Sequence, residues 1–301
     1  MDLRMLETLR AVRSSGGVNA AAPVLHLTPS AVSQQLAALT AEMGVPLTER
    51  VGRGLRLTAA GEALADAAVD VAVAVERARA ACEAFRDQPV GTVRVSAFQS
   101  AARLLFPRLL TAVAAMDGVT LECADEDVAL ADFPVLADRF DVVVAHRPDG
   151  AAGWGAGVRV VPLYREPLDV AVGPGHRLAG RDRVDPAELA GEAWITVREG
   201  FPVAPVLAAV AERSGAAPVI AHRINDFTVA AAMVAAGHGI SLVPRHTTAG
   251  LPGVRLLPLT GVPAGRQVDA LLRPDRAERR VVQRVVGALI ELAAEVDRPG
   301  T

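Results

Sequence analysis

The 301-residue sequence predicts an α/β protein in which a small, mostly helical N-terminal domain precedes a larger α/β region. Residues 17–60 read as two short helices, a turn and two short strands, the arrangement of a winged helix-turn-helix. From residue 92 onward, β-branched runs alternate with helical patterns, which is typical of an α/β sheet with crossover connections. A long helical pattern joins the two regions. We therefore expect three segments, namely residues 1–60, 61–90 and 91–301.

The second helix of the N-terminal domain has a clear start signal. Thr28 is placed to be its N-cap and Pro29 its first residue, where a missing N–H does no harm. Apolar residues recur at helical spacing, and the expected inward face is Val32, Leu36 and Leu39. The exposed N-terminal end offers hydrogen-bonding side chains at Thr28, Ser30, Ser33 and Gln34. Such an end suits entry into the major groove of DNA, where base edges present donors and acceptors.

Residues 50–58 predict the wing, two short strands around a glycine-flanked arginine. We expect Arg50, Arg53 and Arg56 to contact phosphates or a narrow minor groove. Residues 1–60 carry a net charge of +2 in a chain whose net charge is −3, so positive charge gathers on the expected DNA reader. Ser33 and Gln34 alone would also fit a solvated helix face. The combination of helix, turn and wing favours binding of double-stranded DNA.

A long helix is predicted over residues 58–86, with Thr58 as its cap and Glu62 near its positive end. Apolar residues follow spacings of four and three, the pattern of a heptad seam. A helix of this length spans about 40 Å, which favours dimerisation; packing along the chain's own C-terminal region is the alternative. Residues 87–91 then form a hinge. The expected pairing residues are Leu64, Ala68, Val71, Val75, Ala78, Cys82 and Phe85.

The C-terminal region alternates strand and helix patterns. Strands are predicted at residues 92–97, 119–124, 141–145, 168–172, 193–197, 219–224 and 240–243. Helices are predicted near 100–116, 128–138, 186–190, 203–214, 227–237 and 276–297. Ligands of such sheets gather outside the carboxyl ends of strands, near helix N-termini.

Composition and motifs argue against several classes of protein. The sequence has no Gly-rich phosphate loop, no Cys/His metal spacing and no Gly-x-Ser-x-Gly turn, so we expect neither an enzyme nor a bound metal or cofactor. The six histidines are scattered, although His146 and His238 neighbour expected strand ends. The two cysteines, Cys82 and Cys123, are expected to be buried free thiols, with a redox switch as the alternative.

No signal peptide and no membrane span are visible in the sequence, so we expect a cytoplasmic protein. A solute-binding protein would explain residues 91–301 but needs export. The N-terminal residues predict a DNA reader instead.

Five motifs together resemble the LysR-type transcriptional regulators. They are residues 28–34 (TPSAVSQ), 57–61 (LTAAG), 104–109 (LLFPRL), 140–144 (FDVVV) and 234–244 (VAAGHGISLVP). The resemblance covers nearly the whole chain. Thr40 and Thr48 depart from the usual Glu and Phe, which suggests repacking of the DNA reader. Pro23 should cost its helix a hydrogen bond unless that helix starts at Asn19.

The resemblance implies a transcriptional regulator with an effector domain similar to periplasmic solute-binding proteins. Two α/β lobes would be joined by crossovers near 161–167 and 263–269. Lobe one would comprise residues 91–162 and 268–301, and lobe two residues 163–267. Two-fold symmetry matches a pseudo-palindromic operator in a promoter, and the family further implies a homotetramer built from homodimers. RNA polymerase is a further expected partner.

An effector site is expected between the lobes. Ser100 stands where a strand ends and a helix begins, so its hydroxyl and nearby N–H groups could meet a carboxylate; simple helix capping is the alternative. Arg147 could hold a carboxylate, and Glu126 could face an amino group. We expect a small polar effector, anionic or zwitterionic. The full expected set is Phe98, Gln99, Ser100, Ala101, Glu126, Arg147, Thr196, Phe201, Asn225 and Phe227.

Overall fold

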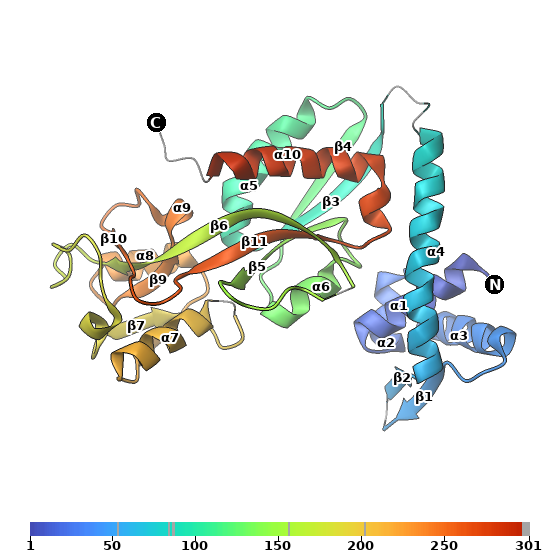
Figure 1. Cartoon of the computed structure of the whole chain (residues 1–301), viewed down its shortest axis with the longest axis horizontal. Coiled ribbons are helices and arrows are strands. Elements are labelled where there is room, and N and C mark those ends of the chain that lie inside the picture. Colours follow the sequence, from blue (N-terminus) through green and yellow to red (C-terminus); the bar gives the residue numbers. More distant parts are fainter. Residues whose placement is uncertain (53, 84, 86–87, 156, 202, 297–301) are drawn as a thin grey trace.

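The computed structural model describes residues 1–52, 54–83, 85, 88–155, 157–201 and 203–296. The N-terminal domain contains α1 (Leu3–Ser15), α2 (Val18–Val24), α3 (Pro29–Met43), β1 (Thr48–Val51) and β2 (Gly54–Leu57), followed by α4 (Ala59–Glu83). Strands β1 and β2 form the predicted antiparallel wing. In Figure 1 the wing lies at one end of this domain. Helix α4 runs from the wing past the C-terminal region from residue 91 onward, which we call the effector region.

The N-terminal core confirms the predicted inward face of α3. Val32, Leu36 and Leu39 of α3 are buried against α1 and the start of α4. Gly61 lets α4 approach the chain before the wing, because a Cβ at this position would overlap the carbonyl oxygen of Leu47. The Thr58 hydroxyl accepts the Gly61 N–H at 3.1 Å and so caps α4 as predicted.

Pro23 does not lie in an opening turn. Because α2 begins at Val18, Pro23 is past the first turn and denies a hydrogen bond to the carbonyl of Asn19. The helix ends one residue later, and His26 then takes a positive φ of 55° in the turn to α3.

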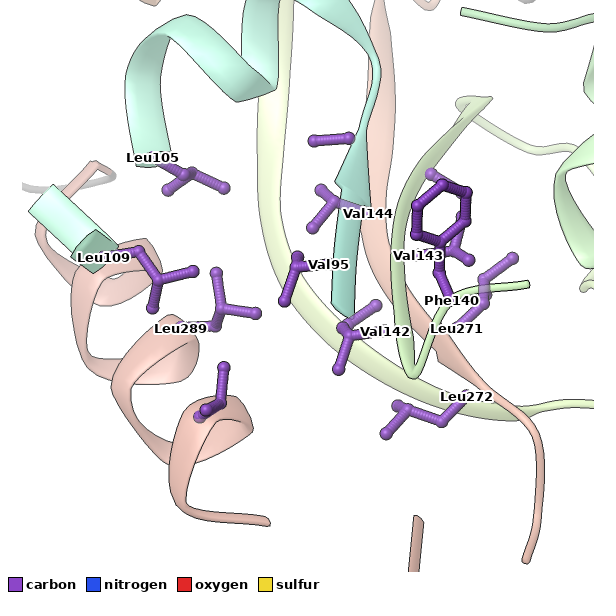
Figure 2. Packing of buried hydrophobic residues seen from close by; sticks show 14 of the residues in the cluster. Val95, Leu105, Leu109, Phe140, Val142, Val143, Val144, Leu271, Leu272 and Leu289 are labelled. Carbon is purple, nitrogen blue, oxygen red and sulfur yellow. The ribbon is translucent and has the colours of Figure 1, made fainter. Parts of the chain in front are cut away.

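Lobe one is built on β3 (Gly91–Ala97), β4 (Val119–Asp125) and β5 (Val142–Pro148), with β3 parallel to both neighbours. Helices α5 (Gln99–Ala114) and α10 (Arg280–Val296) cover one face of the sheet. Figure 2 shows Leu105 and Leu109 of α5 beside Leu289 of α10, facing Val95 and Val142. Phe140, Val143 and Leu271 lie on the other side of the strands.

Lobe two has a smaller core around Trp194. It contains β7 (Ala193–Thr196), β8 (Val219–Arg223), β9 (Ser241–Pro244) and β10 (Arg255–Pro258), with α7 (Ala204–Ser214) and α8 (Phe227–Ala235). Short helical turns complete the effector region: η1 (Leu130–Asp132), α6 (Phe133–Leu136), η2 (Pro186–Leu189), α9 (Arg245–Thr248) and η3 (Arg276–Glu278). The helix expected near 128–138 is therefore only η1 and α6.

Two long antiparallel strands, β6 (Arg159–Val172) and β11 (Gly265–Leu272), pass between the lobes. They overlap the two crossovers that were expected near residues 161–167 and 263–269. The first half of β6 pairs with β11 in the lobe-one sheet, and its second half pairs with β9 and β10 in lobe two. The sequence indicated only residues 168–172 as a strand here, because the first half of β6 lacks a continuous apolar run.

The N-terminal domain docks on lobe one through charged side chains, beside the end of β11. Arg10 of α1 lies 3.5 Å from Asp275, which also pairs with Arg273 at 2.6 Å. Arg273 lies 3.6 Å from Asp138 and 4.0 Å from Glu7. We call Glu7, Arg10, Asp138, Arg273 and Asp275 the docking cluster.

Helix α4 also touches the effector region. Arg77 lies 3.3 Å from Glu278, and Arg280 donates a hydrogen bond to the carbonyl of Glu83 at 2.8 Å. The alternative to dimerisation was that α4 packs along the chain's own effector region. These contacts confirm such packing for one side of the helix. Figure 1 shows α4 beside the lobe-one end of the effector region. No helix in the described part of the chain is both long and apolar enough to cross a membrane.

We predict that Asp275→Asn lowers the free energy of unfolding by about 1–3 kcal/mol at pH 7, because it leaves Arg10 and Arg273 short of a counter-charge. Burial alone would raise the pKa of Asp275, but the hydrogen bond and charge of Arg273, with the charge of Arg10, lower it overall. The contribution is thus complete above the ordinary value of about 4 and is lost as the pH falls through the lowered pKa.

Urea unfolding at pH 7 and below pH 4 measures this effect, and the gap between the two proteins should narrow at the lower pH. Asp182→Asn is the control, since that side chain is 99% exposed beside Arg255. It should change stability by less than about 0.5 kcal/mol. An equal effect of both substitutions would contradict the prediction.

Candidate functional site

The start of α3 presents the predicted hydrogen-bonding side chains to solvent. The Thr28 hydroxyl accepts the Ala31 N–H at 3.2 Å, and Pro29 is the first helical residue, so both predictions of the helix start are confirmed. Thr28, Pro29, Ser30, Ser33 and Gln34 are all exposed. The next glutamine, Gln35, instead hydrogen bonds to Thr8 of α1 within the domain. Its role is therefore structural.

A groove of about 1200 Å³ runs between α2, α3 and the wing. Ser30 and Ser33 line one wall and Arg50 lines the other. Asn19, which sequence reasoning missed, is exposed at the start of α2 and lines the same groove. A polar residue two positions after Gly17, in the first turn of a helix, was the available signal for it. Thr40 and Thr48 also line this groove.

The arginines of the N-terminal domain fall into two groups: exposed arginines on the wing, and arginines that form ion pairs within the chain. Arg50 and Arg56 are exposed on the wing and form no ion pair with any residue that the structure describes. Arg53 lies outside the described residues. Arg10 belongs to the docking cluster, and Arg13 pairs with Asp66 at 2.6 Å. The net charge of residues 1–60 therefore overstates what is available to DNA, because two arginines are already paired within the chain.

A second site lies between the lobes, which we call the inter-lobe pocket. Phe98, Gln99 and Ser100 reach it from the junction of β3 and α5. Lobe two contributes predicted residues that follow strand ends, namely Phe201, Asn225 and Phe227. These six residues, from strand ends in both lobes, line one pocket.

The other four expected residues lie outside the pocket. Ala101 is buried in the core of lobe one, and Thr196 uses its carbonyl to accept the Ile224 N–H at 2.7 Å. Glu126 pairs with Arg139 at 3.1 Å, and Arg147 pairs with Asp269 at 3.0 Å. Charged partners inside the protein thus occupy both groups that were expected to meet the effector.

Arg266 of β11 is the pocket cation that sequence reasoning missed. Its side chain is 1% exposed. It donates to the Ser100 hydroxyl at 2.6 Å and to a Glu166 carboxylate oxygen at 3.4 Å, and its guanidinium lies 4.6 Å from the Phe98 ring centre. The sequence marked its neighbourhood only as a crossover. No local pattern shows that a crossover strand turns an arginine inward.

His146 lies beneath Arg266, with its ring centre 4.1 Å from that of Phe98. Burial, reinforced by the Arg266 charge, lowers the pKa of His146 well below its ordinary value. The imidazole is therefore neutral. Its Nδ1 lies 3.3 Å from an Arg266 nitrogen, and because arginine only donates, Nδ1 accepts and Nε2 carries the proton.

Two hydrogen bonds hold the lobes together over the pocket. Gln99 of lobe one donates to Asp226 of lobe two at 2.8 Å, and Arg103 donates to the Thr228 hydroxyl at 3.3 Å. Inside, only about 10 Å³ is open to the centre of a water molecule, which is the room of about one water. A larger ligand requires the lobes to separate.

We predict that His146→Gln removes an acid-sensitive component of stability. The pKa of His146 is lowered in the folded state, so below about pH 6.5 this histidine binds a proton in the unfolded chain but not in the folded chain. The free energy of unfolding should then fall with decreasing pH by up to about 1.4 kcal/mol per pH unit in the wild type. Denaturant unfolding from pH 5 to 7.5 should show a shallower slope for His146→Gln. The matched control is His222→Gln, at an exposed histidine, and it should keep the wild-type slope. Identical slopes in all three proteins would show that His146 is protonated normally.

Comparisons with known proteins agree over the whole chain. A family profile described as LysR substrate binding domain matches residues 86–294, and one described as bacterial regulatory helix-turn-helix protein, lysR family, matches residues 3–62. The HTH-type transcriptional regulator CbbR of Xanthobacter flavus is 30% identical over 283 residues, which is 91% of this chain and 83% of CbbR.

Solved structures show the same fold. A full-length OxyR variant from Pseudomonas aeruginosa is 20% identical, with a TM-score of 0.68 over 96% of this chain and 98% of OxyR. The crystal structure of CbnR, a LysR family transcriptional regulator, is 26% identical, with a TM-score of 0.54 over 96% of this chain and 100% of CbnR.

Proposed function

This chain belongs to the LysR family of DNA-binding transcriptional regulators, and we propose that it reads an operator with the exposed start of α3. The observation that carries the proposal is the groove between α3 and the wing, where Ser30, Ser33 and Arg50 face one space. Ser30, Ser33 and Gln34 would contact base edges. Arg50, Arg53 and Arg56 would contact the backbone or minor groove. Thr28 and Pro29 would fix the helix start.

Gln34→Ala should relax the preference at one operator base pair by about 1–3 kcal/mol, because it removes a bidentate side-chain contact. Arg56→Ala should instead weaken binding to all sequences alike and lower the salt slope by about one. Selection from a random DNA library, followed by binding titrations at several salt concentrations, separates the two effects. An unchanged base preference for Gln34→Ala would exclude its base-reading role.

A symmetric operator needs two readers, and the second half of α4 offers a surface for pairing. Val75, Ala78 and Cys82 line a shallow hollow on α4, where Ala78 and Cys82 are exposed. Leu64, Ala68 and Val71 instead pack in the N-terminal core of their own chain. We therefore assign pairing to the second half of the expected seam, with Phe85, 94% exposed, at its end. Cys82 is not the buried thiol that was expected.

Replacing Val75 and Ala78 together with Asp should dissociate the dimer, because pairing would bury two unpaired charges. Light scattering at micromolar protein should show the mass fall to that of one chain or, from a tetramer, to that of a dimer. Ala81→Asp is the control, since Ala81 is exposed on α4 and lies outside the seam. An unchanged mass for the double variant, with folding intact, would rule out pairing through this surface.

We infer that a small effector binds in the inter-lobe pocket and shifts the protein between two assemblies. Support comes from the convergence of Phe98, Gln99, Ser100, Phe201, Asn225 and Phe227 on one space, at the strand ends where such sheets bind ligands. An effector that binds one lobe arrangement better changes the populations of both. This proposal includes the domain limits at residues 60, 90 and 162. It also includes a homotetramer, contact with RNA polymerase and action in the cytoplasm.

A further inference from the structure

The inter-lobe pocket leaves donors and an acceptor without partners. The Nε of Arg266 and the Nδ2 of Asn225 are buried and have no hydrogen-bond partner. Buried donors are nearly always paired, and leaving one unpaired costs about 1–3 kcal/mol. Both atoms belong to residues that line the same pocket. They therefore favour a ligand that brings acceptor oxygens.

Ser100 adds a third donor. Its hydroxyl oxygen accepts from Arg266 at 2.6 Å, which leaves the hydroxyl hydrogen free to donate. The three donors come from lobe one, lobe two and the crossover strand β11. A carboxylate placed among them would contact every part of the pocket.

Asp127 supplies the opposite charge. It lines the pocket and makes no hydrogen bond or ion pair with any residue that the structure describes. Asp127 is exposed at one edge of the pocket, yet desolvation by the surrounding protein raises the pKa of this carboxyl despite the nearby charges of Arg266 and Arg198. A ligand cation beside Asp127 would favour its ionised form and so offset the cost of that desolvation.

The charge balance excludes a strongly anionic ligand. The positive charge of Arg266 is already offset by Glu166, which is 0% exposed at 3.4 Å. The pocket therefore has no surplus positive charge for a dianion, and Asp127 would repel one. A ligand with one carboxylate and one ammonium group adds no net charge to this buried site.

Apolar side chains make up the rest of the lining: Phe98, Phe201, Phe227, Val197 and Val203. Phe98 and Phe227 both lie against the Arg266 guanidinium, at 4.6 and 5.9 Å from their ring centres. A polar remainder of the ligand would face these rings without hydrogen bonds. An aliphatic or aromatic remainder would gain from burial there.

We propose that the effector is an α-amino acid with an apolar side chain. This inference rests on the proposed effector site. The ligand carboxylate would accept from Arg266, Asn225 and Ser100, its ammonium group would pair with Asp127, and its side chain would lie among the phenylalanines. Entry requires the lobes to part, since the pocket has room for about one water.

Calorimetry on the full chain with matched probes tests the class of ligand. L-valine, L-leucine and L-phenylalanine are titrated first. L-leucine is then compared with 4-methylpentanoate, which lacks the ammonium group, and with 3-methylbutylamine, which lacks the carboxylate. We expect L-leucine to bind about 10- to 100-fold more tightly than either analogue, as is usual for loss of a charge-assisted hydrogen bond.

Two variants assign the contacts. Asp127→Asn should weaken L-leucine and should bind 4-methylpentanoate at least as tightly as the wild type does, because it removes a negative charge, so the advantage of L-leucine over 4-methylpentanoate should be lost. Asn225→Asp keeps the oxygen that accepts the Arg198 N–H at 2.9 Å but opposes the ligand carboxylate, so it should weaken L-leucine by at least about 10-fold. Asp132→Asn, at an exposed aspartate outside the pocket, is the control and should bind like the wild type.

Equal binding of L-leucine and 4-methylpentanoate to the wild type would overturn the amino-acid proposal. So would failure of all three amino acids to bind, even if a different molecule that co-purifies with the protein is lost in Ser100→Ala; that result would leave the effector site standing. Binding of L-leucine that neither Asp127→Asn nor Asn225→Asp alters would place the ligand elsewhere and overturn the effector site as well.

Discussion

The buried pair of Arg266 and Glu166 is the interaction on which the effector region depends. The two residues are directly opposite each other on the strands that pass between the lobes, β11 and β6. Burying two charges is costly, and only good geometry with further hydrogen bonds compensates for it. Here Ser100 accepts from Arg266, and Glu166 accepts the His246 N–H at 3.0 Å. The pair therefore connects α5, β6, β11 and α9 at one point, and that point is the wall of the pocket.

The same strand connects the pocket with the DNA-binding domain. β11 begins beside Arg266 and ends at Leu272, and the next residues, Arg273 and Asp275, belong to the docking cluster that holds α1. A ligand that parts the lobes must break the Gln99–Asp226 hydrogen bond and change the setting of the crossover strands. A contiguous path of contacts therefore runs from the pocket through β11 and the docking cluster to α1 of the DNA-binding domain.

The residues that could be predicted are those whose role is set locally. Thr28 and Pro29 mark a helix start by capping rules, and Ser100 and Phe227 lie in the pocket because each follows the carboxyl end of a strand in its own lobe. Prediction failed where a partner from a distant segment decided the outcome. Arg147 was expected to bind the effector, but it pairs with Asp269. Arg266 was expected only to be part of a crossover, but β11 directs its side chain toward Ser100. No sequence pattern links Arg147 to Asp269, and none links Arg266 to Ser100.

The heptad pattern of α4 was correct about apolarity and incomplete about partners. The apolar stripe of α4 has two environments along its length. Ala68 is buried in its own domain, whereas Ala78 and Cys82 are exposed. Periodicity cannot tell these apart, because both require the same spacing. On another face of the helix, Arg77 contacts the effector region. Docking through Arg77 and the proposed pairing through Val75 and Ala78 use different faces of α4, whereas the Arg280 contact reaches the carbonyl of Glu83 at the end of the hollow. A pairing chain on Val75 and Ala78 would therefore leave the Arg77 contact in place.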